Sequence, residues 1–115
     1  HAIQVRLNAE NPVTLAPSPG KLWECHWPGG PGVRIDTHAY TGYDMPSSFD
    51  SLLAKLIVWA PSRDESIAKL KAALSETKLL GVDTLIPLHQ AILSEEDFRK
   101  RNITIHYLEE HKNLL

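Results

Sequence analysis

The sequence predicts an α+β domain, in which an antiparallel sheet in the N-terminal half is accompanied by helices packed beside it. Two observations support this fold class. Apolar and polar residues alternate through much of the first 40 residues, which is the period of a half-buried strand. From residue 62 onward apolar residues recur at helical spacing. Strands that come before helices, rather than alternating with them, indicate that the two kinds of element are segregated.

The expected strands lie in the first 59 residues. Residues 3–7 alternate with a period of two, and residues 23–27 and 33–39 do the same. A Gly- and Pro-rich turn at 28–32 separates the last two, which predicts that they form an antiparallel hairpin. The apolar run 52–59 predicts a strand buried on both faces.

A long helix is expected after this strand. Ser62 can cap its N-terminus, and Glu65 follows three residues later, as a capping box requires. Gly81 is expected to end the helix. Apolar side chains that would face the core recur at helical spacing: Ile67, Leu70 and Leu74.

Short elements are expected in the C-terminal third. A helix over 84–93 would be capped by Thr84, and Pro87 is tolerated there because it falls in the first turn. Residues 94–97 indicate another short helix. Residues 103–105 could be extended, and residues 106–112 could form a final helical turn or two.

Length and composition limit the class of protein. The chain has 115 residues, of which 43% are hydrophobic, and a formal net charge of −2; these values are typical of one soluble domain with a buried core. No basic stripe indicates nucleic acid, and no apolar run approaches the roughly 20 residues of a membrane-spanning helix. The single cysteine, Cys25, excludes an internal disulfide and fits a reducing compartment.

The chain opens directly on a strand pattern, without an initiator Met and without a charged or apolar leader. We therefore expect no signal peptide. We expect residues 1–115 to be one domain cut from a longer polypeptide.

Six histidines raise the question of a metal site, which we do not expect. His26 and His38 lie on neighbouring predicted strands, but no further Cys and no clear carboxylate accompany them. His106 and His111 are five residues apart, so they point about 140° away from each other around a helix. A metal-dependent hydrolase built on His26 and His38 is kept as a third alternative.

Other common catalytic motifs are missing from the sequence. The Gly-rich turn at 28–32 lacks the Lys-Ser/Thr pair and the following helix of a phosphate-binding loop. Cys25 has no evident His or Asn partner arrangement. These patterns alone therefore predict a small domain without a self-contained active site.

Arg34 is the most informative candidate residue. It lies two residues beyond the Gly/Pro turn, on the polar face of a predicted strand. Its planar guanidinium suits a carboxylate, a bicarbonate or a urea-like carbonyl. The alternative is a solvated arginine that pairs locally with Asp36 or Glu24.

Two other cations stand in unusual places. Lys55 interrupts an apolar run, so it is either a buried functional lysine or a lysine whose stem lies along the core and whose ammonium reaches water. Arg63 stands at the predicted helix start, where a cation opposes the macrodipole. This position indicates an external carboxylate, for example across an interface.

Motifs along the whole chain resemble the C-terminal domain of biotin carboxylases. This family includes the biotin carboxylase parts of acetyl-CoA, propionyl-CoA, pyruvate and urea carboxylases. The matching segments occur in the family's order and spacing: HAIQVRLNAENP at 1–12, PSPG at 17–20, PGGPGVR at 28–34, DSLLAKLI at 50–57, RD at 63–64 and IHYLE at 105–109.

The resemblance implies a fold and a reaction. The fold would be that of the biotin carboxylase C-terminal domain, a barrel-sandwich hybrid. ATP would activate bicarbonate as carboxyphosphate, and the resulting CO2 would carboxylate N1 of biotin on a carrier protein. An ATP-grasp domain upstream in the same chain would hold the phosphates, the Mg or Mn ions and the general base. The implied partners are therefore this domain, the biotin carboxyl carrier and a second copy in a homodimer.

The resemblance also implies roles for particular residues. Arg34 matches the family arginine that reaches into the active site and contacts biotin and bicarbonate, where a cation stabilises the oxyanion on the ureido carbonyl. Ile105 matches the position beside bound adenine, and His106 follows it in the vicinity of ATP. Trp59 and Arg63 fall where bacterial members make dimer contacts.

The sequence departs from the family at three places. Ser48-Phe49 stand where the family usually has Tyr-Tyr, and Thr84-Leu85 where it often has Thr-Asn. Leu80 replaces an acidic residue used at the dimer interface of some bacterial enzymes. The last replacement removes a group that the bacterial-type dimer uses, whereas none of the three affects Arg34.

One alternative of another class stays open: a purely structural or dimerisation platform with no direct active-site role. The form PGGPGVR is similar to that of bacterial acetyl-CoA carboxylases, which implies fatty acid biosynthesis and a cytoplasmic location. Residues 73–81 are also similar to urea carboxylases, so the acceptor that the parent carboxylates stays open. A mitochondrial or plastid location would apply if the parent were an organelle enzyme.

Overall fold

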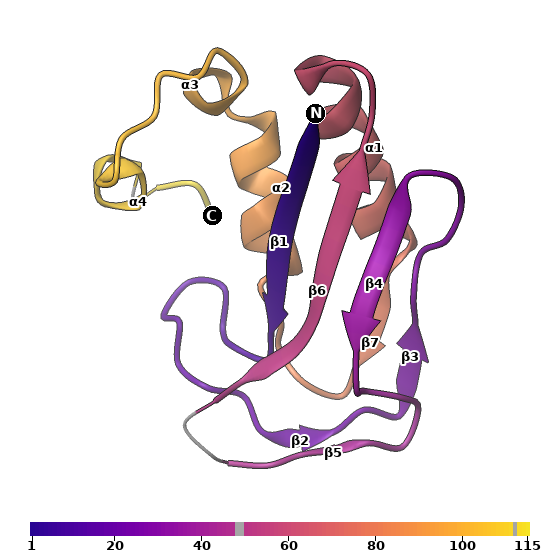
Figure 1. The fold of residues 1–115 in the computed structure, drawn as a ribbon. Coiled ribbons are helices and arrows are strands. Elements are labelled where there is room, and N and C mark those ends of the chain that lie inside the picture. The colour runs from indigo at the N-terminus through magenta and orange to yellow at the C-terminus, as the bar shows by residue number, and fades with distance from the viewer. Residues whose placement is uncertain (48–49, 112) are drawn as a thin grey trace.

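The structure is a computed structural model of residues 1–115, and it describes all of them except residues 48, 49 and 112. The departure at Ser48 and Phe49 therefore lies outside the described residues, as does the last residue of the predicted turn at 106–112. Figure 1 shows most of the strands before the first helix along the chain and the helices in the C-terminal half, where one short strand, β7 (Lys78–Leu80), follows the first helix. The predicted α+β class is confirmed.

A three-stranded antiparallel sheet forms the upper part of the molecule. β6 (Leu52–Trp59) lies between β1 (Ala2–Asn8) and β4 (Val33–Thr37). The apolar positions of β1 and β4 stand opposite the buried positions of β6, since Val5 and Ile35 both pair with Leu56. The period of two that predicted these strands thus also aligns their apolar faces.

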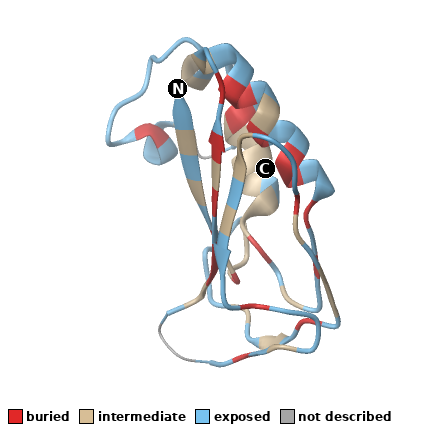
Figure 2. Ribbon diagram, turned by 45° about the vertical axis from the view of Figure 1, so that its right-hand side comes forward, coloured by how far each residue is buried: buried red, intermediate tan, exposed pale blue. Residues whose placement is uncertain are grey.

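Two helices cover one face of this sheet. α1 (Arg63–Glu76) begins where predicted, because Ser62 caps it by accepting a hydrogen bond from the backbone N–H of Glu65. α2 (Ile86–Ser94) packs beside α1 and carries Pro87 in its first turn, as expected. Figure 2 shows that the buried residues lie along the sheet and along the helix surface that faces it. The main core combines sheet and helix side chains: Leu7, Ala54, Leu56, Val58, Ile67, Leu70, Ala73, Leu74 and Leu93.

Two small sheets form the lower part of the molecule. β2 (Gly20–Lys21) pairs with β5 (Asp44–Met45), and β3 (Glu24–His26) pairs with β7 (Lys78–Leu80). They enclose a second core cluster: Ala9, Leu22, Ala39, Met45, Leu53 and Leu79. The strands of the described residues lie in these three separate sheets and close no barrel.

The predicted hairpin between residues 23–27 and 33–39 is wrong. β3 pairs with β7, so Cys25 stands opposite Leu79 and packs against the lower cluster. β4 pairs instead with β6 and joins the upper core. The Gly/Pro segment between them therefore leads from one sheet to another. Turn chemistry predicts that the chain changes direction, but it does not predict which strand becomes the neighbour.

β6 is not buried on both faces along its length. Leu53 is buried in the lower cluster, but Lys55 and Trp59 are exposed and Ile57 is only half-buried. The reason is that α1 and α2 cover one face only. Buried and more exposed residues therefore alternate along most of β6, although its sequence is almost entirely apolar.

Helix ends differ from the prediction at two places. α1 ends at Glu76, where Thr77 turns into extended backbone, and Gly81 instead follows β7 with a φ of 115°. A Cβ at Gly81 would overlap the carbonyl oxygen of Lys21, so this position requires glycine. The N-cap of α2 is Leu85 rather than Thr84, and its side chain makes no capping hydrogen bond.

The C-terminal segment forms two short helices, α3 (Glu96–Arg99) and α4 (Tyr107–Glu110). Glu95 caps α3 with its carboxylate, and residues 103–105 form no strand. None of the helices in the described part of the chain has the length and apolar character that a membrane crossing requires.

Candidate functional site: an open sheet face

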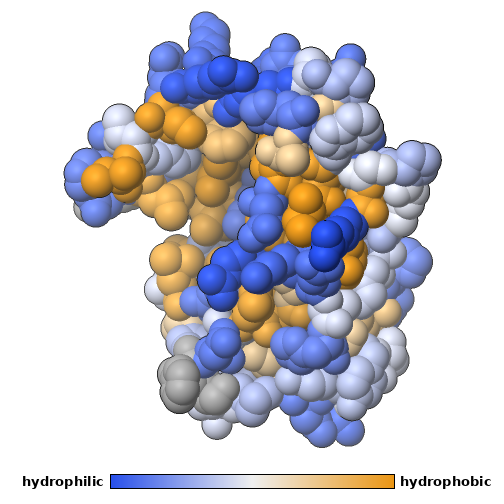
Figure 3. All heavy atoms as spheres, in the orientation of Figure 1, coloured by the Kyte–Doolittle hydropathy of each residue, from blue (hydrophilic) through white to orange (hydrophobic). Residues whose placement is uncertain are grey.

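No helix of the described residues covers the second face of the three-stranded sheet. Figure 3 looks onto this face and shows hydrophilic side chains crossing the sheet between hydrophobic areas. Register and exposure place one set of residues on it: Ala2, Gln4 and Arg6 from β1, Lys55, Ile57 and Trp59 from β6, and Arg34 and Asp36 from β4. We call this surface the open sheet face. It brings together cations that are far apart in the sequence.

Arg34 lies on the open sheet face, as the sequence predicted for the polar side of its strand. Its Nε donates to Asp36 Oδ1 at 2.9 Å, which is the local pair expected as the alternative. The side chain nevertheless remains 72% exposed. This pair uses only the Nε edge, and no other hydrogen bond of the guanidinium is made to the described residues. The two terminal nitrogens can therefore still receive a ligand.

Asp36 restricts the direction of Arg34 more than it stabilises the fold. An exposed ion pair contributes at most about 1 kcal/mol, because water screens it and both side chains lose freedom. The contact to Nε, however, orients the guanidinium relative to Asp36, on a strand that positions its Cα. The geometry thus places an exposed, oriented cation on the open sheet face.

Lys55 is exposed on the open sheet face and not buried within the core. The sequence left two interpretations of Lys55 open, and the structure confirms the one in which the ammonium reaches water. Arg6 lies directly opposite Lys55 in the ladder between β1 and β6, and it is also exposed. Sequence reasoning missed this pairing, because register depends on which strands become neighbours.

Trp59 and Arg63 occupy different environments. Trp59 ends β6 with 58% of its surface exposed, on the same open face. Arg63 finds internal partners, since its Nη1 and Nη2 donate to the carbonyl oxygens of Arg99 and Phe98 at 2.8 and 2.7 Å. Its guanidinium also lies 5.0 Å from the centre of the Phe98 ring. The unusual cation at the start of α1 is thus explained within the chain by contacts to α3.

Ile105 and His106 lie apart from Arg34. The segment that contains them precedes α4 beyond the β1 edge of the sheet, whereas β4 forms the other edge (Figure 1). Ile105 is 95% exposed, and His106 Nδ1 lies 3.3 Å from Glu109 Oε2. The structure therefore does not join the two predicted groups of site residues into one cluster.

The histidines suggested for a metal do not meet in paired strands. His26 belongs to β3, and His38 follows β4 and packs edge-on against Tyr43. Nearby, burial raises the pKa of the Cys25 thiol, which makes this cysteine a poorer nucleophile. Neither the hydrolase alternative nor a cysteine mechanism gains support from this geometry.

A different group of possible ligand atoms lies between α3 and α4. Glu95, Asp97 and His111 bring their ligand atoms within 4.8 Å of one another. These atoms already bind one another and their surroundings: His111 Nε2 lies 3.0 Å from Asp97 Oδ2, and Tyr107 donates to Glu95 Oε2 at 3.2 Å. This network, the α3–α4 clasp, was not predicted from the sequence. Its only local signal is the Glu-x-Asp spacing at the start of a short helix.

Hydrogen bonding sets the ionisation of the α3–α4 clasp. The backbone carbonyl of Tyr107 accepts from His111 Nδ1 at 2.9 Å, and this bond, followed by the bond to Asp97, raises the pKa of His111. Burial and the nearby carboxylates raise the pKa of Tyr107 to about 12. The phenol therefore stays protonated and can donate to Glu95 throughout the neutral range.

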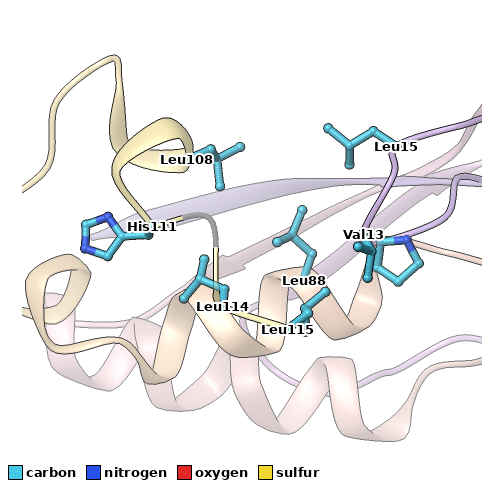
Figure 4. Close-up of a pocket in the computed structure, with 8 residues that line it drawn as sticks. Val13, Leu15, Leu88, Leu108, His111, Leu114 and Leu115 are labelled. Carbon is cyan, nitrogen blue, oxygen red and sulfur yellow. The ribbon is translucent and has the colours of Figure 1, made fainter.

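An apolar pocket of about 240 Å³ opens between the residue 12–15 loop, α2 and the C-terminus. Figure 4 shows its leucines converging from these three elements and from α4, while the His111 ring points away from them. No predicted site residue lines this pocket. Its geometry therefore adds nothing to the chemistry expected of Arg34.

This arrangement of sheets and helices occurs as one domain of larger carboxylating enzymes. The biotin carboxylase domain dimer of the Hydrogenobacter thermophilus 2-oxoglutarate carboxylase, solved with MgADP, ADP and bicarbonate, superposes with a TM-score of 0.95 and 40% identity. The match covers 98% of this chain and 25% of that one.

The chain belongs to the biotin carboxylase C-terminal domain family, whose sequence model matches residues 4–110. The biotin carboxylase of Haemophilus influenzae is 50% identical over 109 residues, which are 95% of this chain and 24% of that protein. The chloroplastic biotin carboxylase of Arabidopsis thaliana is 43% identical over 100% of this chain and 22% of its own length. The chain thus spans about a quarter of these relatives.

Proposed function

We propose that this chain is the C-terminal domain of a biotin carboxylase and that it supplies Arg34 to an active site built mainly by an upstream ATP-grasp domain. The reaction would be the ATP- and bicarbonate-dependent carboxylation of biotin on a carrier protein. The observation that carries the proposal is an exposed guanidinium, directed by Asp36, on the open sheet face. Membership of the family supports it.

The short length of the chain fits this division of labour. Relatives are about four times as long, and the sequence contains no phosphate-binding loop. ATP with its Mg or Mn ions would therefore be held by the part of the parent that this chain does not contain. The solved Hydrogenobacter relative, which binds MgADP and bicarbonate, is consistent with this assignment.

The chemical task of Arg34 follows from charge. Negative charge builds up on the ureido oxygen of biotin as N1 gives up its proton to the general base of the parent and becomes nucleophilic toward CO2, and a cation held beside that oxygen lowers the barrier. The free terminal nitrogens of Arg34 offer two parallel N–H donors for such an oxygen or for the planar bicarbonate. Arg34 thus acts by stabilising charge and needs no proton transfer.

Ile105 and His106 would contact the adenine end of ATP, away from its phosphates. Because a nucleoside triphosphate is long, contacts to its base are expected well away from the γ-phosphate and bicarbonate. Their separation from Arg34 across the sheet is compatible with that arrangement. The exposed Ile105 side chain would pack against adenine, with His106 beside it.

Arg34 can be tested in the full-length carboxylase. We expect Arg34→Ala to reduce the kcat for biotin carboxylation about 10²-fold to 10³-fold, the usual loss when one oxyanion donor is removed. The KM for ATP should stay within about twofold, because the proposed contacts of this residue are to biotin and bicarbonate and not to the nucleotide. Arg34→Lys should restore only part of the rate, since an ammonium lacks the planar fork.

Arg101→Ala provides a matched control, because it removes an exposed arginine from the loop after α3. It should leave the reaction unchanged. If Arg34→Ala carboxylates biotin at the normal rate, Arg34 has no place in the active site.

A dimerisation platform is the second candidate function, and the exposed Trp59 favours it. In that case Trp59 and Arg63 would contribute to a homodimer interface and Arg34 would only pair with Asp36. Sedimentation of the full-length enzyme separates the two functions. A dimer that Trp59→Ala dissociates, together with full activity of Arg34→Ala, would favour the platform alone.

A further inference from the structure

Two cations on the open sheet face are not explained by the role of Arg34. Arg6 and Lys55 stand directly opposite each other across β1 and β6, and both side chains are exposed. Neither has an ion-pair partner within 4.0 Å among the residues that the structure describes, whereas Arg34 has Asp36. Asp36 stands opposite Lys55 on the other side, in β4, but its carboxylate is bound to Arg34 Nε, so Arg6 and Lys55 face each other with no ion pair of their own in the described part of the chain.

This pairing breaks a rule of sheet stability. Like charges directly opposite one another across a ladder repel, and Gln4, the neighbour of Arg6 on the same face of β1, is neutral. Asp36, opposite Lys55 on β4, offsets only part of this repulsion, because it is bound to Arg34. A local arrangement that costs stability without an evident structural gain is typical of a functional surface.

The register brings Lys55 within reach of the same ligand as Arg34. Arg34 pairs with Ile57, so Lys55 lies diagonally from it, two residues along the neighbouring strand. Diagonal neighbours on one sheet face are about 7–8 Å apart, which long side chains span easily. Arg6 extends the row to the third strand. Asp36, opposite Lys55, is already bound to Arg34 Nε and leaves the terminal nitrogens open.

We propose that Lys55 and Arg6 are further substrate-binding residues of the Arg34 site, and that the three cations together bind a carboxylate-class oxyanion, bicarbonate in the parent reaction. This inference rests on the proposed function. The planar O–C–O group fits the Arg34 fork, while Lys55 and Arg6 add point charges that attract the anion. Three cations and one carboxylate leave a local charge of two positive units on an otherwise acidic chain.

Steady-state kinetics of the full-length carboxylase test the inference. Lys55→Gln should raise the KM for bicarbonate about 5–10-fold while kcat and the KM for ATP stay within about twofold, because the residue binds substrate without touching the reacting biotin. Arg6→Gln should act in the same direction but less strongly, since it lies one strand further from Arg34. Lys55→Arg keeps the charge and should restore most of the affinity.

Lys71→Gln is the matched control, because this exposed lysine lies on α1, outside the sheet. It should change neither KM. An unchanged bicarbonate KM in Lys55→Gln would overturn the inference. So would a lowered melting temperature or faster proteolysis between domains with normal kinetics, since that outcome would mean that Lys55 binds acidic side chains of the parent chain.

The two proposals fail in distinguishable ways. If Arg34→Ala loses carboxylation and Lys55→Gln is normal, the further inference is wrong and the proposed function stands. If Arg34→Ala keeps full activity, the proposed function is wrong, and so is the inference that Arg34, Lys55 and Arg6 bind bicarbonate together.

Discussion

The sheet with α1 and the C-terminal segment with α3 and α4 are held by different forces. The first is stabilised by apolar packing, since Leu56 and Leu70 are fully buried between β6 and α1. The second has a single buried residue among those described there, Tyr107, and is held by the α3–α4 clasp of hydrogen bonds and charges. One region is thus stabilised by burial, the other by polar contacts.

This difference has consequences for function. Apolar packing is insensitive to pH and gives the rigid sheet on which Arg34, Lys55 and Arg6 are displayed. The clasp depends on particular partners and on the charge of His111. The clasp holds the segment that begins with Ile105. The proposed adenine contact therefore lies in the region that is held by polar contacts. Three changes test this contrast.

The largest effect is expected in the apolar region. Leu56→Ala removes a fully buried side chain from the centre of the sheet and should lower the free energy of unfolding by about 2–5 kcal/mol. Urea unfolding measures this change. Leu115→Ala, at a 52% exposed position, is the control and should have little effect. Similar small losses for both variants would show that the sheet core does not dominate stability.

A smaller and local effect is expected from Tyr107→Phe. The variant loses the hydrogen bond to Glu95 but keeps the ring packed against Phe98, so it should cost about 1 kcal/mol. Amide hydrogen exchange should quicken in residues 95–111 and stay unchanged in the sheet. Tyr40→Phe, which alters an exposed ring, is the control. Uniformly faster exchange would contradict a separate C-terminal unit.

The smallest effect is a pH dependence confined to the clasp. The pKa of His111 is raised in the folded chain by its bond to the Tyr107 carbonyl and then by Asp97. Its contribution to stability is therefore complete below the ordinary value of about 6.5 and is lost as pH rises through the folded pKa. After correction for intrinsic rates, exchange in residues 104–111 should be slower at about pH 6 than at about pH 8.

His111→Gln keeps a hydrogen-bonding side chain without the titration, so its corrected exchange rates should be the same at both pH values. Equal protection of the natural chain at the two pH values would mean that the imidazolium does not hold the clasp.

Local pattern predicted the elements better than their partners. Alternation predicted the strand at 3–7, an apolar run predicted the strand at 52–59, and helical spacing with capping chemistry predicted the helix that begins after Ser62. The partner of residues 33–37 did not follow. A strand of that pattern fits beside any apolar strand, and the burial gained against Leu56 and Val58 decides between them.

The candidate site likewise has one part that local pattern predicted and one part that it did not. The motif that ends in Arg34 and the alternation of β4 placed this arginine on a polar face, because side-chain direction along a strand depends on local geometry alone. The pairing of Arg6 with Lys55 was not predictable, since it needs the register of two strands more than 40 residues apart.

The sequence by itself therefore determined the α+β class, the family and the presentation of Arg34, all of which depend on short-range patterns of residue type. Only the tertiary structure decided which strands pair, which sheet face stays open and which partners Arg63 and His111 bind. Those features depend on the surface that all elements bury together, and this surface is defined only after the elements have packed against one another.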